Sequence, residues 1–129
     1  MERLCAWLIV VSLQLACGVA QACMFARDAQ PKDWDAWADA LFAADVSGVE
    51  REKTLDVITL RVVETFKGPP NAATARLQVP SRLWRSCNLP RPSAGERVLV
   101  ALNPGGDTLV VPLSAGYTEQ LREYRSRKQ

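Results

Sequence analysis

Apolar residues recur with a helical period shortly after the first quarter of the chain. Pro31 suits the opening of a helix, because its missing N–H would have no partner in the first turn anyway. The residues that follow at spacings of three, four, seven and eight share one helical face: Trp34, Trp37, Ala38, Leu41 and Phe42. We therefore predict an amphipathic helix that opens at Pro31 and includes these residues.

The remaining pattern is that of β-strands. In the clearest run, Ile58, Leu60, Val62 and Phe66 alternate with polar residues and are expected on one face of a strand. Strands are predicted at residues 45–52, 55–66, 75–79, 97–102 and 108–113, with an irregular proline-containing loop around Cys87. Residues 68–71 and 103–107 are rich in turn-forming residues, and the second of these predicts a hairpin connection.

The last predicted element is a helix with Tyr117, Leu121 and Tyr124 on one stripe. Five strands with a helix near each end indicate a mainly β fold. We predict a five-stranded, partly open barrel of the OB type, with a short N-terminal helix and a C-terminal helix.

The first 22 residues have the pattern of an export signal. Arg3 precedes an apolar run at residues 6–20, and residues 20–22 form the small-x-small motif that signal peptidases recognise. As a helix the run would span roughly 22 Å, less than the hydrocarbon thickness of about 30 Å. We expect cleavage after Ala22 and a secreted or periplasmic domain of residues 23–129. A lipid on Cys17 and an uncleaved anchor are the alternatives.

Cleavage would leave two cysteines, Cys23 and Cys87. In an oxidising compartment an even pair is most simply a disulfide. Closing a loop of about 65 residues would stabilise the fold by roughly 4 kcal/mol in the chain-entropy model. Two free thiols, or a reactive Cys87 activated by nearby arginines, are the alternatives.

The composition narrows the chemistry. The chain contains no histidine, which excludes Ser-His-Asp and Cys-His nucleophiles and histidine zinc sites. We predict no catalytic residues, no cofactor and no metal ion of its own, and hence no enzyme. The net charge of +2 is too small to indicate a dedicated nucleic-acid-binding protein.

Two groups of cations are candidates for binding an anionic polymer. One is the loop around Cys87, where the aromatic side chain of Trp84 lies among the cations Arg82, Arg85 and Arg91. The other is the basic C-terminal tail: Arg122, Arg125, Arg127 and Lys128. A buried tryptophan and a solvated helix end are the simpler explanations of the two groups.

The order of several short motifs resembles a known family. After Cys23 and a short helix come Ala-Asp-Val-Ser-Gly-Val at residues 44–49 and Glu-Thr-Phe-Lys-Gly at 64–68. Ser-Cys at 86–87 and Gly-Glu-Arg-Val-Leu-Val at 95–100 follow. This order resembles bacterial relatives of the tissue inhibitors of metalloproteinases, which carry a netrin-like OB domain. The similarity covers about residues 23–121.

The resemblance implies a role for the mature N-terminus. In those inhibitors the N-terminal cysteine forms a disulfide with a distant cysteine, which matches Cys23 with Cys87. Its α-amine and carbonyl chelate the zinc of the target protease, and the next residue, here Met24, enters the specificity pocket. A second bridge of the family is missing, because Phe25 and residues 114–116 contain no cysteine. The simpler alternative is that Cys23 only ties the N-terminus to the barrel.

Two classes of function follow. The first is an exported, monomeric, non-enzymatic protein-binding module whose partner is a secreted zinc metalloprotease or another extracytoplasmic protein. The second is an OB barrel that binds a glycan or nucleic acid through the arginine-rich loop and the tail, of which nucleic acid is the less expected ligand.

Overall fold

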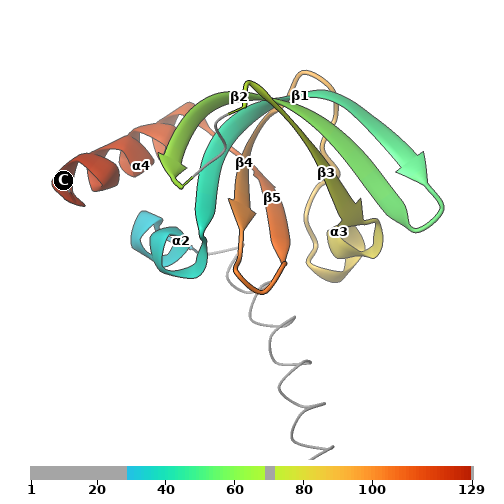
Figure 1. The fold of residues 1–129 in the computed structure, drawn as a ribbon, viewed down its shortest axis with the longest axis horizontal. Helices are drawn as coiled ribbons and strands as arrows, with labels where there is room; N and C mark the ends of the chain where they lie inside the picture. Colours follow the sequence, from blue (N-terminus) through green and yellow to red (C-terminus); the bar gives the residue numbers. More distant parts are fainter. Residues whose placement is uncertain (1–28, 69–71, 129) are drawn as a thin grey trace, which may run out of the picture.

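The computed structural model describes residues 29–68 and 72–128 (Figure 1). The expected signal peptide and the expected contact residues Cys23 and Met24 lie outside these ranges. No helix in the described part of the chain is long and apolar enough to cross a membrane. The elements follow in this order: α2 (Pro31–Trp37), β1 (Ala40–Glu52), β2 (Leu55–Lys67), β3 (Thr74–Pro80), α3 (Arg82–Ser86), β4 (Arg97–Leu102), β5 (Thr108–Pro112) and α4 (Ala115–Lys128).

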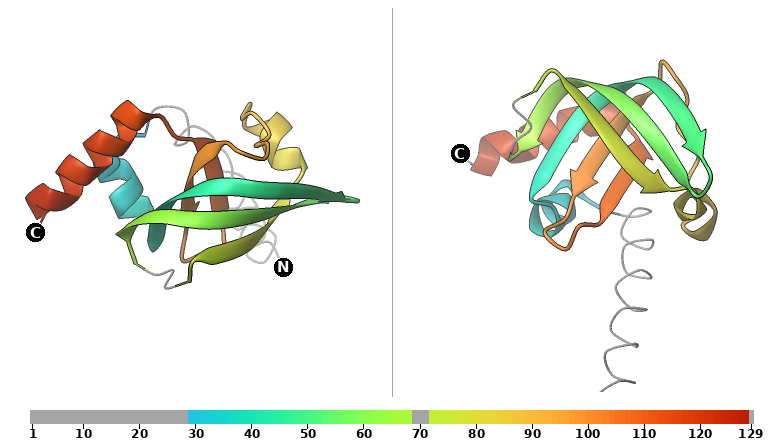
Figure 2. Two further views of the ribbon diagram at one scale, coloured as in Figure 1. Left: turned by 90° about the horizontal axis from the view of Figure 1, so that it is seen from above. Right: turned by 45° about the vertical axis from the view of Figure 1, so that its right-hand side comes forward.

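The strands form one antiparallel sheet of five, in the order β3-β2-β1-β4-β5. Strands β1, β2 and β3 are neighbours in sequence, and the chain then returns to place β4 on the other side of β1. This is the Greek-key order. The sheet curls without closing, so that β3 and β5 are its two edges (Figure 2). The predicted mainly β fold with a helix near each end is confirmed.

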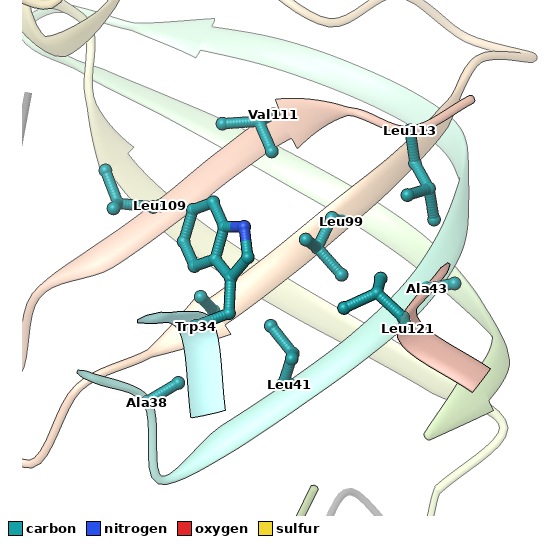
Figure 3. Close-up of a cluster of buried hydrophobic side chains, with 10 residues drawn as sticks. Trp34, Ala38, Leu41, Ala43, Leu99, Leu109, Val111, Leu113 and Leu121 are labelled. Atoms are coloured by element: carbon teal, nitrogen blue, oxygen red, sulfur yellow. The ribbon is translucent and has the colours of Figure 1, made fainter. Parts of the chain in front are cut away.

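The sheet carries a hydrophobic cluster on each face. Helices α2 and α4 lie together at one end of the sheet, and α3 lies at the other (Figures 1 and 2). The first cluster joins Trp34 of α2 and Leu121 of α4 to Leu41 and Leu99 of the sheet (Figure 3). The second cluster, which we call the inner cluster, contains Trp84 of α3 and the alternate strand residues: Phe42, Ala44, Val46, Ile58, Leu60, Val79, Val98, Val100 and Val110. Both faces of β1 and β4 are therefore buried.

The N-terminal helix is shorter than its apolar pattern predicts. It ends at Trp37, and Ala38 already has an extended backbone with φ −98° and ψ 141°. Leu41 and Phe42 lie in β1, where they point to opposite faces and enter different clusters. The expected helix through Phe42 is thus wrong, because a strand buried on both faces has consecutive apolar residues, as a buried helix does.

The expected face of Phe66 is also wrong. Ile58 and Leu60 belong to the inner cluster and Val62 packs against it. Phe66 instead packs against the first cluster, on the face that α2 and α4 cover (the helix-covered face). Between them Val63 is an extra residue, because Ala43 pairs with Glu64 and Ala44 pairs with Val62. This β-bulge changes the alternation of side chains along β2.

The loop around Cys87 contains a helix that the sequence pattern did not reveal. Helix α3 has only five residues, too few for an apolar period to be recognised. Trp84 is its one buried residue and holds the helix against the inner cluster. The bounds predicted for β2, β3, β4 and β5 are confirmed to within one residue at each end, and the final helix forms as α4. Strand β1 begins at Ala40, five residues before its predicted start, because the apolar residues assigned to the helix belong to this strand.

Candidate functional site around helix α3

The candidate site is built on Cys87, the residue that follows α3. Its side chain is 1% exposed, and its backbone N–H donates a hydrogen bond of 2.9 Å to the carbonyl of Leu83. Cys87 is disulfide-bonded. The prediction that Cys23 is the partner, and the role predicted for Met24, concern residues outside the described ranges.

A fully buried carboxylate, that of Asp56 in β2, contacts α3 and the residues before and after it. Its Oδ1 accepts a hydrogen bond of 2.8 Å from the hydroxyl of Ser81, the residue before α3. Its Oδ2 accepts one of 2.7 Å from the indole N–H of Trp84 and lies 3.0 Å from Nε of Arg91. Nε of Arg51, in the β1–β2 hairpin, lies 4.0 Å from Oδ1. One side chain therefore joins four segments of the chain.

These contacts keep Asp56 ionised. Burial alone would raise the pKa of this carboxyl. The hydrogen bonds from Ser81 and Trp84 and the charges of Arg91 and Arg51 outweigh burial, so that the pKa of Asp56 lies below its ordinary value. The site is thus a charged, fully satisfied polar cluster next to the inner hydrophobic cluster.

The same contacts change the interpretation of the arginine-rich loop. Trp84 is 5% exposed and packs in the core, so its ring offers no surface on which a ligand could stack. Arg91 is engaged with Asp56, while Arg82 and Arg85 are exposed. The predicted group of cations around an aromatic ring is therefore not assembled at the surface.

The basic tail is engaged in a similar way. Arg122 donates to Glu64 of β2, with a shortest N–O distance of 2.7 Å, and also pairs with Glu119. Arg125 donates to the carbonyl of Thr65 at 2.6 Å, and Lys128 pairs with Asp35 of α2. The hydrogen bond from Arg122 is the main cause that holds the pKa of Glu64 below its ordinary value. These cations fasten α4 to the sheet and to α2. Arg127 is exposed.

A cavity of about 490 Å³ lies beside Cys87. One wall is formed by the end of β3 and by α3, and the other by the turn between β4 and β5 and the start of β5. Its lining residues are Gln78, Pro80, Arg82, Leu83, Ser86, Cys87, Gly106, Asp107, Thr108 and Leu109. The cavity therefore opens between the two unpaired edges of the sheet. Over residues 29–68 and 72–128, no group of three or more cysteine, aspartate, glutamate or histidine side chains is placed to hold a metal ion.

Comparison with known proteins does not assign a family. No protein-family model matches the chain, and no curated protein matches its sequence.

The sequence interpretation missed Asp56, the central residue of the site. A signal for it was present, because Asp56 has the same alternation as Ile58 and Leu60, which were assigned to the buried face. A charged residue at an inward position predicts a partner in the core. The partners themselves lie 25 to 35 positions further along the chain, and only the fold brings them together.

Proposed function

We propose that this protein is an exported, non-enzymatic protein-binding module with a netrin-like OB barrel, and that its mature N-terminus at Cys23 binds a zinc metalloprotease. The observation that carries the proposal is the buried, disulfide-bonded Cys87 at the end of helix α3. The Greek-key order of an unclosed five-stranded sheet also supports it, because the OB fold is a partly open Greek-key barrel.

The binding chemistry resides in the first two residues of the mature chain. A free α-amine has a pKa near 8, so part of it is neutral at pH 7 and can ligate zinc together with the carbonyl of Cys23. A disulfide to Cys87 would fix that dipeptide before binding and reduce the entropy lost on association. Met24 has a flexible apolar side chain suited to a protease specificity pocket.

The first experiment determines the mature chain. Protein recovered from the periplasm or the medium is analysed by intact mass and by peptide mapping without reduction. We expect loss of residues 1–22, a monomer and a linked peptide containing Cys23 and Cys87. A diacylglyceryl adduct on Cys17, retention of the first 22 residues or free thiols would contradict the proposal.

The second experiment measures inhibition of a panel of secreted zinc proteases by the mature protein. One alanine added before Cys23 would move the amine by about 3.5 Å, too far for a zinc–ligand distance of about 2 Å. We expect this extension to abolish inhibition, and Met24→Arg to weaken it, at an unchanged melting temperature. One alanine added after Gln129 is the matched control and should leave inhibition unchanged. Absence of inhibition by the mature protein at micromolar concentration would refute the proposed target class, and inhibition by the extended form would refute zinc chelation.

The engaged cations make an anionic polymer the less favoured ligand. The test is retention of the mature protein on an immobilised sulfated glycan. Retention that falls steeply with added salt would favour polymer binding instead.

A further inference from the structure

Asp56 contacts the segment of residues 81–91, which contains Cys87, on both sides of that cysteine. Ser81 precedes α3, Trp84 lies within it, and Arg91 follows it. These are the only side chains besides Arg51 for which the described part of the chain shows a polar contact with this carboxylate. The segment is therefore held at its beginning, middle and end by one residue of β2.

Helix α3 needs such an external anchor. A single helical turn is unstable on its own, because nucleation costs more than one turn of hydrogen bonds returns. Packing of Trp84 against the inner cluster supplies part of the stability, but the hydrophobic effect itself is non-directional. The hydrogen bond of 2.7 Å from the indole N–H to Oδ2 of Asp56 adds a directional constraint on the orientation of the indole ring.

The orientation of Trp84 is transmitted to Cys87 through the backbone. The N–H of Cys87 donates to the carbonyl of Leu83 at 2.9 Å, and the N–H of Leu89 donates to the carbonyl of Trp84 at 2.8 Å. The first bond closes the turn that contains Trp84, and the second begins at the carbonyl of Trp84 itself. A rotation or opening of α3 therefore moves the backbone of Cys87.

We propose that Asp56 is the positioning residue of the site: it fixes α3 in one orientation and thereby holds the disulfide-bonded Cys87 against the barrel. This proposal stands on the described residues alone. Its consequence for the Cys23 amine, which Asp56 would position through the disulfide, rests on the proposed function.

The test uses four variants of the mature protein and a control. Asp56→Leu has a similar shape but no acceptor, which leaves the buried indole N–H without a partner. Asp56→Asn keeps an acceptor for Trp84 and can donate to the hydroxyl of Ser81, so it removes mainly the charge. Trp84→Phe removes the indole N–H, and the fourth variant combines it with Asp56→Leu. Asp45→Leu is the matched control, because Asp45 also pairs with two arginines but has no contact with α3.

The readout is amide hydrogen exchange at Cys87 and Leu89, relative to amides of the central strand β1 in the same sample. The ratio separates opening of α3 from a general loss of stability. The rate at which dithiothreitol reduces the disulfide of Cys87 is measured in parallel.

We expect Asp56→Leu to accelerate both exchange at α3 and disulfide reduction about tenfold or more, as the loss of one buried partner implies. Asp56→Asn should show a clearly smaller effect. The combined variant should be slower than Asp56→Leu alone, because it no longer buries an unpaired N–H. Asp45→Leu should leave the ratio unchanged.

The proposal is overturned if Asp56→Leu changes exchange at α3 and β1 equally, or if Trp84→Phe adds to its effect instead of reducing it. If Asp56→Leu does not fold, Asp56→Asn and Trp84→Phe are compared with the wild-type protein. The proposal requires each of these two variants to accelerate exchange at α3 more than at β1, and it is overturned if either does not. These outcomes do not involve a protease. If the protein inhibits a protease, Asp56→Asn should weaken inhibition more than Asp45→Asn, and a failure of that arm alone would refute only the link to Cys23.

Discussion

Leu121 is the residue on which the attachment of α4 to the sheet depends most. It is 2% exposed, and Thr118 is the only other buried residue of this 14-residue helix. Its side chain lies over Leu99 and Leu41 in the cluster that α2 also covers (Figure 3). The ion pairs of Arg122 on α4 are partly open to solvent, and such pairs contribute less to stability than a buried apolar contact. Replacing Leu121 by alanine therefore removes the main contact of α4.

The expected cost follows from the burial of Leu121. A buried leucine replaced by alanine loses its transfer free energy and leaves a cavity, which together destabilise a protein by about 2–5 kcal/mol. We take about 3 kcal/mol, because α4 lies at the edge of the cluster and can partly collapse into the space. For a domain of roughly 100 residues this corresponds to a melting temperature lower by about 10–15 °C.

The assay is urea denaturation of the mature protein followed by circular dichroism. Two controls define the scale. Leu121→Met keeps the volume and should cost less than about 1.5 kcal/mol. Gln120→Ala changes an exposed neighbour and should lie within about 0.5 kcal/mol of the wild type. A cost below 1 kcal/mol for Leu121→Ala at an unchanged denaturant slope would refute the inference that Leu121 anchors α4.

Two further predictions concern acid stability and a turn. The hydrogen bond from Arg97 is the largest cause that lowers the pKa of Asp45 from 3.8 to about 2. Folding therefore favours the ionised form, and this stabilisation should be complete above about pH 5 and lost as the pH falls toward 2. In urea titrations Arg97→Gln should lose less stability over that range than the wild type, and equal losses would contradict the prediction. Gly68→Ala should lower the melting temperature more than Gly95→Ala. Both glycines have positive φ, but only at Gly68 would a Cβ lie 2.3 Å from the carbonyl oxygen of Asp39, and equal shifts would disprove that contact.

The sequence by itself determined the features that depend on near neighbours. Strand β4 has the predicted bounds, and β5 ends one residue earlier than predicted. The turn between them forms where residues 103–107 predict it, with the backbone N–H of Gly105 donating to the side chain of Asn103. The helix with Leu121 on its buried stripe also forms. In each case the period or the turn chemistry lies within a few residues, and no distant partner has to be known.

The tertiary structure decided where those local patterns end and which side chains they bury. Helix α2 ends at Trp37, because Leu41 and Phe42 lie in a strand and are buried on opposite faces of the sheet. A bulge in β2 moves Phe66 to the helix-covered face. A period counted along one strand cannot anticipate either outcome, since both depend on the register with another strand.

The candidate site shows the same division. Its cysteine and arginines are visible in the sequence, but the role of Arg91 and the burial of Trp84 follow from Asp56, which lies about 30 positions away. A buried carboxylate is tolerated only where several donors converge on it, and convergence is a property of the folded chain. The sequence therefore showed the cysteine and the arginines of the site, and only the fold showed Asp56 and the contacts that join it to Ser81, Trp84 and Arg91.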